Sequence, residues 1–380
     1  MKNKVMILFP EGNFPYSPTT LNLVHFLAKH FEVFLLTSGF SDDHSVDTSL
    51  FTHIPLNLSN SKTSNNILFR IVRKVRRKLF PTSNDGTIIP IQDRHKFELI
   101  AKHIRNIKPF TIIAIDLFAL FCCKRLDVEC IFLSLEIPSE SIYLNSLSHS
   151  KIEYVIIQSS DRYEYLFKGL TYKPPCFILP NTPVFKYPEK RTIASNKLIY
   201  NGYIWSAFGP QFCLSFVVKY PEFELHLKGN RNGEELIDVY FPYLKNSDHV
   251  FIDERYLQKH ELDLYLQNFS IGFCFYNFSH PFIQRNAFNY ETGPSGKLYA
   301  YLGMGLPVIC SKIKAFKIVE EFEAGILIED YSPDSIKAAV DKILANYSFF
   351  SDNALKLAEQ NCFAKHIGPI IDYLIAKPLN

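Results

Sequence analysis

The chain has 380 residues, of which 47% are hydrophobic and 21% charged, and its formal net charge is +3. That length is enough for two domains with separate cores, and the charge is too small to indicate nucleic acid as a partner. No apolar run reaches the ~20 residues of a membrane-spanning helix; residues 112–123 come nearest and contain Asp116. The N-terminus enters a strand directly, without the pattern of a signal peptide, so we expect a cytoplasmic globular protein.

The eight cysteines show no metal-binding pattern. Neither a Cys-x-x-Cys pair nor a histidine cluster accompanies them, and most stand in apolar, strand-like runs. We therefore expect free thiols buried in the cores and no metal site.

The first half of the chain alternates between expected strands and helices. Residues 4–9 form a continuous apolar run, typical of a central parallel strand, and a helix and a second strand follow within residues 19–37. Further strands are expected at 110–115, 129–135, 153–158 and 176–179, with helices at 93–107 and 161–167. This order predicts a doubly wound sheet. The first strand–helix loop lacks G-x-G-x-x-G, so we expect no dinucleotide there.

Residues 66–80 (NILFRIVRKVRRKLF) combine an apolar stripe with six cations and no acid. The pattern predicts a basic amphipathic helix. Such a helix binds an anionic membrane surface, where each cation contributes roughly 1 kcal/mol. The alternative is a helix docked on its own domain with a solvated basic face. No aromatic platform for RNA accompanies the segment.

Three carboxylates follow predicted strands. Asp116 comes after the strand at 110–115, and Glu136 and Glu140 come after the strand at 129–135. Because the carboxyl ends of parallel strands face the ligand crevice, each is a candidate catalytic base or acceptor contact. Glu136 is the preferred candidate, and a structural role is the alternative for each.

Residues 180–196 are rich in proline and poor in apolar residues, which is typical of a linker. After it, strands at 197–201, 223–227, 250–252, 271–275, 308–310 and 325–328 alternate with helices at 208–219, 258–268 and 333–346. This order predicts a second doubly wound sheet. We expect domains at 1–185 and 196–350, followed by a C-terminal segment, 351–380, that contains a helix near 352–374.

Residues 289–311 (NYETGPSGKLYAYLGMGLPVICS) read as a loop, a helix from Lys297 to Gly303, a turn and a buried strand. A Gly/Ser loop that opens a helix leaves backbone N–H groups beside the positive end of the helix dipole, where phosphate can bind. Lys297 could neutralise phosphate charge, and Arg285 falls in the same predicted loop. The alternatives are an ordinary loop and a solvated lysine in the first turn of the helix.

The run PSGKLYAYLGMGLPVICS resembles the donor-site segment of GT-B glycosyltransferases, especially the retaining family four. The resemblance implies two Rossmann-like domains facing across a cleft, with a nucleotide-sugar on the second domain. It also implies that the helix in 351–380 crosses back to the first domain. Backbone N–H groups and a cation can stabilise a departing phosphate without a metal. The expected donor contacts are Glu291, Gly293, Ser295, Gly296, Lys297, Arg285 and Tyr203.

The sequence departs from the family pattern. Ala300 stands where the family has a glutamate that binds the ribose hydroxyls, and the partner position falls at Thr292, one residue from Glu291. Residues 202–208 contain no cation to clamp a diphosphate. Two explanations fit these departures. The donor could have only one phosphate, as a cytidine monophosphate sugar has, or the chain could have lost catalysis. Tyr203 or Trp205 could stack on the base or sugar, or belong to the core.

We therefore expect a glycosyltransferase that moves a sugar from a nucleotide-activated donor to a glycan or lipid-linked glycan. The basic segment suggests work at the inner face of the cell membrane, in bacterial surface polysaccharide assembly. The alternatives are a non-catalytic GT-B-like subunit that partners an active transferase, and a sugar-nucleotide epimerase. Retention or inversion stays open; an inverting enzyme needs a general base, for which Glu136 and Asp116 are the candidates.

Overall fold

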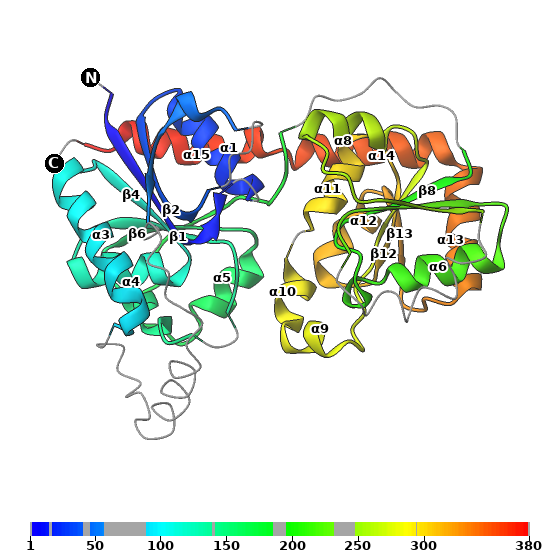
Figure 1. The fold of residues 1–380 in the computed structure, drawn as a ribbon, viewed down its shortest axis with the longest axis horizontal. Coiled ribbons are helices and arrows are strands. Elements are labelled where there is room, and N and C mark those ends of the chain that lie inside the picture. The colour runs from blue at the N-terminus through cyan, green and yellow to red at the C-terminus, as the bar shows by residue number, and fades with distance from the viewer. Residues whose placement is uncertain are drawn as a thin grey trace, which may run out of the picture. The chain divides into compact units, whose positions relative to one another are not determined.

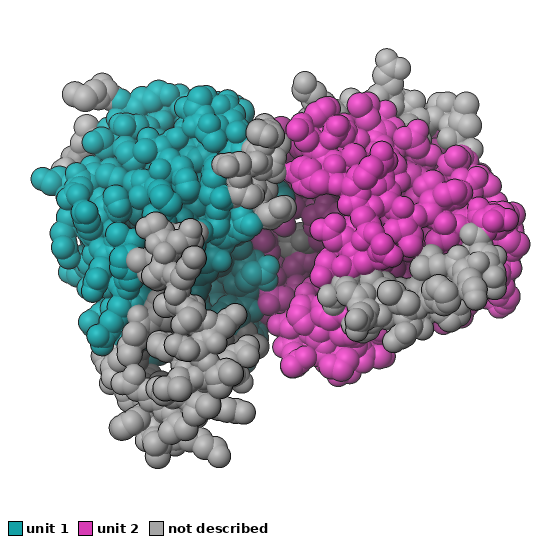
Figure 2. All heavy atoms as spheres, in the orientation of Figure 1, with its two compact units in different colours: residues 1–157, 163–177, 369–380 teal, residues 158–162, 178–368 magenta. Residues whose placement is uncertain are grey.

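A computed structural model describes residues 2–14, 17–40, 46–56, 89–138, 141–184, 195–231, 248–293 and 295–378. The chain forms two compact units, coloured separately in Figure 2. The first unit comprises residues 1–157, 163–177 and 369–380, and the second comprises residues 158–162 and 178–368. Each unit is built on a sheet whose strands alternate with helices along the chain (Figure 1).

The first unit contains a 7-stranded sheet with the order β3-β2-β1-β4-β5-β6-β7. Its strands are β1 (Lys4–Asn13), β2 (Glu32–Gly39), β3 (Thr52–Pro55), β4 (Thr111–Ile115), β5 (Cys130–Ser134), β6 (Ile152–Ile157) and β7 (Cys176–Ile178). The pairs from β3 to β6 are all parallel. Residues 5–8 of β1 are fully buried, as expected for a central strand covered on both faces, and each such side chain contributes roughly 1.5–3 kcal/mol.

The helices of the first half of the chain connect these strands. They are α1 (Pro18–Ala28), η2 (Thr48–Leu50), α3 (Ile91–Ile107), α4 (Asp116–Leu126), η3 (Leu144–Ser148) and α5 (Ser160–Leu166). Most predicted elements are confirmed within one or two residues. The others differ: β1 continues to Asn13, through residues expected to form a loop, and β3, α4 and the short helices η2 and η3 were not predicted.

The second unit contains a 6-stranded sheet with the order β10-β9-β8-β11-β12-β13, and all its pairs are parallel. Its strands are β8 (Lys197–Asn201), β9 (Glu224–Lys228), β10 (Val250–Asp253), β11 (Ile271–Cys274), β12 (Val308–Ser311) and β13 (Gly325–Ile328). The prediction of two doubly wound α/β domains is confirmed. In both units the first strand of the sheet has the second and the fourth as neighbours, which is the order of a Rossmann-type sheet.

Helices of the second half cover both faces of this sheet, except that the last of them belongs to the first unit from residue 369 on. They are η4 (Ser206–Phe208), α6 (Pro210–Lys219), α8 (Lys259–Leu266), α9 (Pro281–Arg285), α10 (Ala287–Thr292), α11 (Gly296–Gly303), η5 (Lys314–Phe316), α12 (Lys317–Glu321), α13 (Pro333–Ala345), α14 (Tyr347–Gln360) and α15 (Phe363–Ala376). Alternate residues of β8 belong to two separate cores: Leu198 packs with α6 and α13, whereas Ile199 packs with α11 and α14. This alternation is the period of two that a strand imposes.

The structure corrects two predictions in this half. The single helix expected near 352–374 is two helices, α14 and α15, because the chain turns at Asn361 and Cys362. The predicted loop that was to contain Arg285 and residues 289–292 is largely helical, in α9 and α10.

Two predictions receive no test from the fold. The basic segment 66–80 lies outside the described residues. The domain boundaries at 185, 196 and 350 stay predictions, and most of the expected linker is likewise outside that part of the chain. Across the described helices, none has the length and apolarity to cross a membrane.

Candidate functional site

Helix α11 starts at the carboxyl edge of the second sheet, because a helix between two parallel strands begins where the preceding strand ends. Tyr301 fixes this helix in place. Its phenol oxygen accepts a hydrogen bond from the backbone N–H of Asn201 at the end of β8. Its ring crosses β11 at Gly272, where a Cβ atom would lie 2.5 Å from the ring. The N-terminus of α11 is thereby held near the point between β8 and β11 where the strand order reverses, which is where doubly wound sheets bind ligands.

The N-terminus of α11 lacks the side-chain cap that its sequence could supply. Ser295 occupies the N-cap position and is buried, but its side chain makes no capping hydrogen bond. Its hydroxyl instead donates to the phenol oxygen of Tyr276. Within the described residues, the backbone N–H groups of Gly296 and Lys297 have no acceptor. As far as the described part of the chain is concerned, two amides at the positive end of a helix are therefore available to an anion.

The side chain of Lys297 turns inward, onto aromatic rings. Its ammonium nitrogen lies 4.7 Å from the ring centroid of Tyr200, 5.5 Å from that of Tyr276 and 5.7 Å from that of Phe208. These are distances at which the negative face of an aromatic ring attracts a cation. No carboxylate of the described residues lies within ion-pair distance of this ammonium group.

Burial lowers the pKa of Lys297, because the charged amine loses solvation. The thiols of Cys213 and Cys310 lie close enough to interact with it electrostatically. Burial raises the pKa of both thiols well above the usual value, so at neutral pH they supply no negative charge. The site thus holds a cation that lacks a counter-ion in the described part of the chain.

The turn after β8 lies against Lys297. Gly202 has φ +142°, and a Cβ atom on it would lie 3.8 Å from Cδ and 3.9 Å from Nζ of Lys297. Beyond the turn, Trp205 packs against Phe208, His280 and Phe282, with ring centroids 5.7, 5.0 and 4.7 Å apart. Tyr203 is 44% exposed beside them. An aromatic surface therefore adjoins the partly buried ammonium group of Lys297.

The predicted donor contacts do not all converge. Gly296 and Lys297 meet at the helix start, but Arg285 is exposed on α9, where its Nε donates to the carbonyl of Pro281 one turn earlier. Glu291 is exposed on α10. The interpretation that Arg285 shares a loop with Lys297 was wrong, since residues 281–285 and 287–292 form helices and no described contact joins the two side chains.

At Gly293 lack of space, and not backbone conformation, requires glycine, because any residue can adopt its φ of −83°. A Cβ atom there would lie 2.5 Å from the carbonyl oxygen of Asn289 and 2.9 Å from Nη1 of Arg162. Arg162 belongs to the second unit and is only 1% exposed. The sequence offered no signal for this arginine, nor for the aromatic residues around Lys297, because their positions along the chain are far from residue 293.

In the first unit, Asp116 opens α4 directly after β4, beside β1, at the reversal point of that sheet. Its backbone is left-handed, with φ +61°. One carboxylate oxygen, Oδ1, accepts the backbone N–H groups of Leu135 at 2.9 Å and Glu136 at 3.3 Å. The end of β5 and the start of α4 are therefore held together by this carboxylate.

Burial raises the pKa of Asp116 to about 7, and the two N–H donors oppose part of that rise. The neighbouring carboxylates of Glu136 and Glu11 raise it further. Glu136 itself is exposed, and Glu140 lies outside the described residues. A carboxyl group that titrates near neutrality can accept and release protons at physiological pH, which is what general-base catalysis requires.

Comparisons with known proteins identify the fold. No protein-family model and no curated protein sequence matches the chain. Several solved structures match it over nearly its whole length. Anabaena Alr3699/HepE in complex with UDP is 12% identical, with a TM-score of 0.69 over 99% of this chain and 100% of that one. Sucrose-phosphate synthase from Thermosynechococcus elongatus is 13% identical, with a TM-score of 0.68 over 99% and 100%.

WaaG, a glycosyltransferase involved in lipopolysaccharide biosynthesis, is 11% identical, with a TM-score of 0.62 over 98% of this chain and 100% of that one. These likenesses show that the chain has the GT-B glycosyltransferase fold, as the sequence predicted.

Proposed function

We propose that the protein is a glycosyltransferase whose second unit binds a nucleotide-activated sugar at the N-terminus of α11. The observation that carries the proposal is the position of Lys297. Its ammonium group is held on three aromatic rings, without a carboxylate partner among the described residues, and beside two helix amides for which that same part of the chain supplies no acceptor. A partly buried cation without a counter-ion carries a desolvation cost that a ligand with negative charge would offset.

Phosphate fits this arrangement chemically. Its oxygens accept hydrogen bonds from the backbone amides of Gly296 and Lys297, and its charge neutralises the ammonium group of Lys297. The same donors would stabilise the charge that develops on the phosphate oxygen as the bond to the sugar breaks. The Tyr203–Trp205 surface would take the base or the sugar by stacking. Gly293, Ser295, Arg285 and Glu291 stay proposed donor contacts.

The solved structures support the donor class. The Anabaena HepE structure contains UDP, another structure of the same protein contains UDP-glucose, and the pneumococcal O-GlcNAc transferase GtfA is complexed with UDP and GlcNAc. For this chain we keep both donor classes open to test, diphosphate and cytidine monophosphate sugars, because Ala300 offers no carboxylate to a ribose.

We assign acceptor activation to Asp116 in the first unit, with Glu136 as the second candidate. Asp116 combines a position at the reversal point of the sheet with a pKa of about 7. If the enzyme inverts configuration, this carboxylate would remove the proton from the acceptor hydroxyl. Glu136 is exposed and contributes its backbone N–H to Asp116.

The proposed acceptor is a glycan or a lipid-linked glycan at the inner face of the cell membrane, in surface polysaccharide assembly. The motivation is the basic pattern of residues 66–80. Co-sedimentation with vesicles of anionic lipid tests it: replacement of Arg73, Arg76 and Arg77 by Gln should release the protein into the supernatant. Unchanged sedimentation of the triple variant would contradict membrane binding through this segment.

Tryptophan fluorescence can report nucleotide binding at the proposed donor site, because Trp205 is the only tryptophan of the chain. Trp205 packs on Phe208, and Phe208 also contacts Lys297. We would titrate the protein with UDP, GDP, ADP, dTDP and CMP sugars and follow tryptophan fluorescence. One nucleotide class should change the emission. Lys297→Met should weaken that binding by about tenfold or more, the loss of one charge-assisted contact.

The matched control is Lys317→Met, since the Lys317 side chain is 73% exposed in the same unit; it should bind like the wild type. A flat titration with all five classes would contradict a donor site. Turnover separates the alternatives: a transferase releases nucleotide only with an acceptor, an epimerase converts the donor sugar alone, and a binding subunit does neither.

A further inference from the structure

Lys228, the last residue of β9, is a buried cation whose hydrogen-bond donors are taken by the chain itself. Its side chain is 4% exposed, and its ammonium group lies 3.4 Å from Oδ1 of Asp253 at the end of β10. It also donates to the backbone carbonyls of Asp253, at 3.3 Å, and of Arg255. These three oxygens satisfy the three donors of an ammonium group. Lys228 therefore ties the end of β9 to the loop that follows β10.

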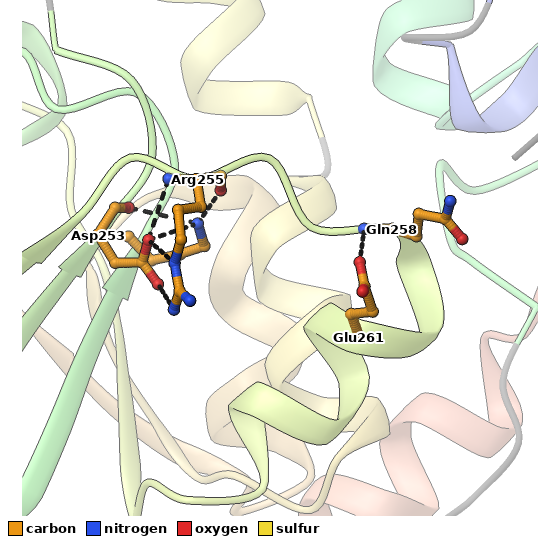
Figure 3. A network of polar contacts seen from close by, with 5 residues as sticks. Asp253, Arg255, Gln258 and Glu261 are labelled. Carbon is orange, nitrogen blue, oxygen red and sulfur yellow. Dashed lines mark hydrogen bonds and ion pairs between the residues drawn. The ribbon is translucent and has the colours of Figure 1, made fainter. Parts of the chain in front are cut away.

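That loop is itself fixed by side chains (Figure 3). Arg255 donates from Nε to Oδ1 of Asp253 at 3.0 Å and from Nη2 to Oδ2 at 2.8 Å, and its backbone N–H donates to Oδ1 at 3.0 Å. Farther along, Gln258 and Glu261 form a capping box that starts α8. The carboxylate of Asp253 thus forms ion pairs with both Lys228 and Arg255. These contacts and the capping box restrain the segment from β10 to α8.

Lys228 is connected to the donor site through the backbone. In register, it lies between Asn201 of β8 and Asp253 of β10. Its carbonyl accepts the N–H of Gly202 at 2.8 Å. The next residue, Gly229, donates its own N–H to the carbonyl of Asp253 at 3.0 Å. The turn at Gly202, which lies against the side chain of Lys297, is therefore bonded to the residue that Asp253 holds.

We propose that Lys228 is a positioning residue of the donor site: by joining the ends of β9 and β10, it sets the Gly202 turn against which the Lys297 ammonium group rests. The inference depends on the proposed function for its ligand. It assigns a role to a residue that contacts neither the phosphate nor the reacting atoms. The ion pair of Lys228 and Asp253 holds the Gly202 turn in its binding geometry before the nucleotide arrives. The entropy cost of ordering this turn when the nucleotide binds is therefore lower.

The test measures nucleotide affinity through Trp205 fluorescence and thermal stability on the same samples. Lys228→Met keeps the length of the side chain and removes its charge. We expect the Kd for the nucleotide that the wild type binds to rise about tenfold or more, because binding sites lose affinity steeply when their groups shift by an ångström. Should Lys228→Met fail to fold, Asp253→Asn keeps the backbone carbonyls and weakens only the carboxylate, and a smaller rise in Kd is expected.

The control is Arg231→Gln, whose ion pair with Glu254 lies near the same strand ends but is exposed; its Kd should equal that of the wild type. A role confined to stability would lower the melting temperature of Lys228→Met and Asp253→Asn and leave Kd unchanged well below that temperature. That result would overturn the inference while the proposed function stood. Absence of nucleotide binding in the wild type would instead remove the proposed function, and this inference with it.

Discussion

Gly229 lies so close to the carbonyl group of Gly202 that a Cβ atom on Gly229 would be 1.9 Å from the Gly202 oxygen. Both residues adopt φ values near +140°, which L side chains rarely do. The contact brings the turns after β8 and β9 together, and one of those turns borders Lys297. Two glycines thus determine a close approach of backbones next to the proposed donor site.

The first prediction follows from this contact. Gly229→Ala should destabilise the second unit by about 3 kcal/mol or more, because the new methyl group meets a backbone carbonyl that has no room to move and the backbone is strained as well. Urea unfolding followed by circular dichroism measures the change. Gly368→Ala is the control: nothing lies within 4 Å of its added Cβ in helix α15, so it should be neutral or stabilising by up to about 1 kcal/mol. Equal effects of the two substitutions would contradict the close contact.

Lys297→Met should separate stability from binding. The pKa of Lys297 is lowered, so the fold disfavours the charged amine, and the charge destabilises the unliganded protein at pH values below that pKa. Methionine fills a similar volume without the charge. We expect the unliganded variant to be about 1 kcal/mol more stable than the wild type at pH 7, and to lose the stabilisation that nucleotide gives the wild type. Thermal unfolding with and without nucleotide measures both, and a less stable unliganded variant would count against an uncompensated buried charge.

Asp116→Asn should change how stability depends on pH. In the unfolded chain this carboxyl titrates near 3.8, and in the folded protein at about 7. Between these values the folded state holds the additional proton, so the contribution of Asp116 to stability falls as pH rises from about 4 to 7 and is constant above. The difference amounts to at most about 4 kcal/mol. Asparagine can still accept the N–H groups of Leu135 and Glu136 and tolerates the left-handed backbone.

To test this, the free energy of unfolding is measured at pH 5 and at pH 8 for the wild type and for Asp116→Asn. The wild type should lose more stability than Asp116→Asn over that interval, since all other groups are shared. In activity assays the variant should lose most of its sugar transfer, and the wild-type rate should rise with pH through about 7. Parallel pH profiles of stability in the two proteins would show that Asp116 titrates normally.

Glu153→Gln should destabilise the first unit. Lys377, after α15, forms an ion pair with Oε1 of Glu153 on β6, and the hydroxyl of Tyr373 donates to Oε2 at 3.2 Å. The two charged side chains are only 10% and 14% exposed, so removal of the Glu153 charge leaves buried Lys377 with only the more distant carboxylate of Glu129, 3.9 Å away, at a cost of up to about 3 kcal/mol. Glu359→Gln breaks a pair with Lys365 whose side chains are 60% and 51% exposed, and should cost less than about 1 kcal/mol. Chemical unfolding compares them; similar losses would mean that the Glu153 pair is not effectively buried.

The sequence alone identified most strands of the two sheets and the start of the proposed donor site. An apolar run such as residues 4–9 indicated a central strand, and the glycines and serine before Lys297 indicated the opening of a helix, because backbone geometry and solvent exclusion act locally. The apolar run 112–123, by contrast, is divided between β4 and α4. For the same reason the strand–helix alternation identified a doubly wound architecture before any contact was known.

What surrounds Lys297 was decided by tertiary structure. Tyr200, Phe208 and Tyr276 come from three separate segments, and they meet its ammonium group only because the strand order places β8 beside β11. The pKa of Asp116 likewise depends on burial, and Lys228 reaches its partner because β9 pairs with β10. Charge, solvation and close contact depend on distance in space, which a linear sequence records only where neighbours in the chain are also neighbours in the fold.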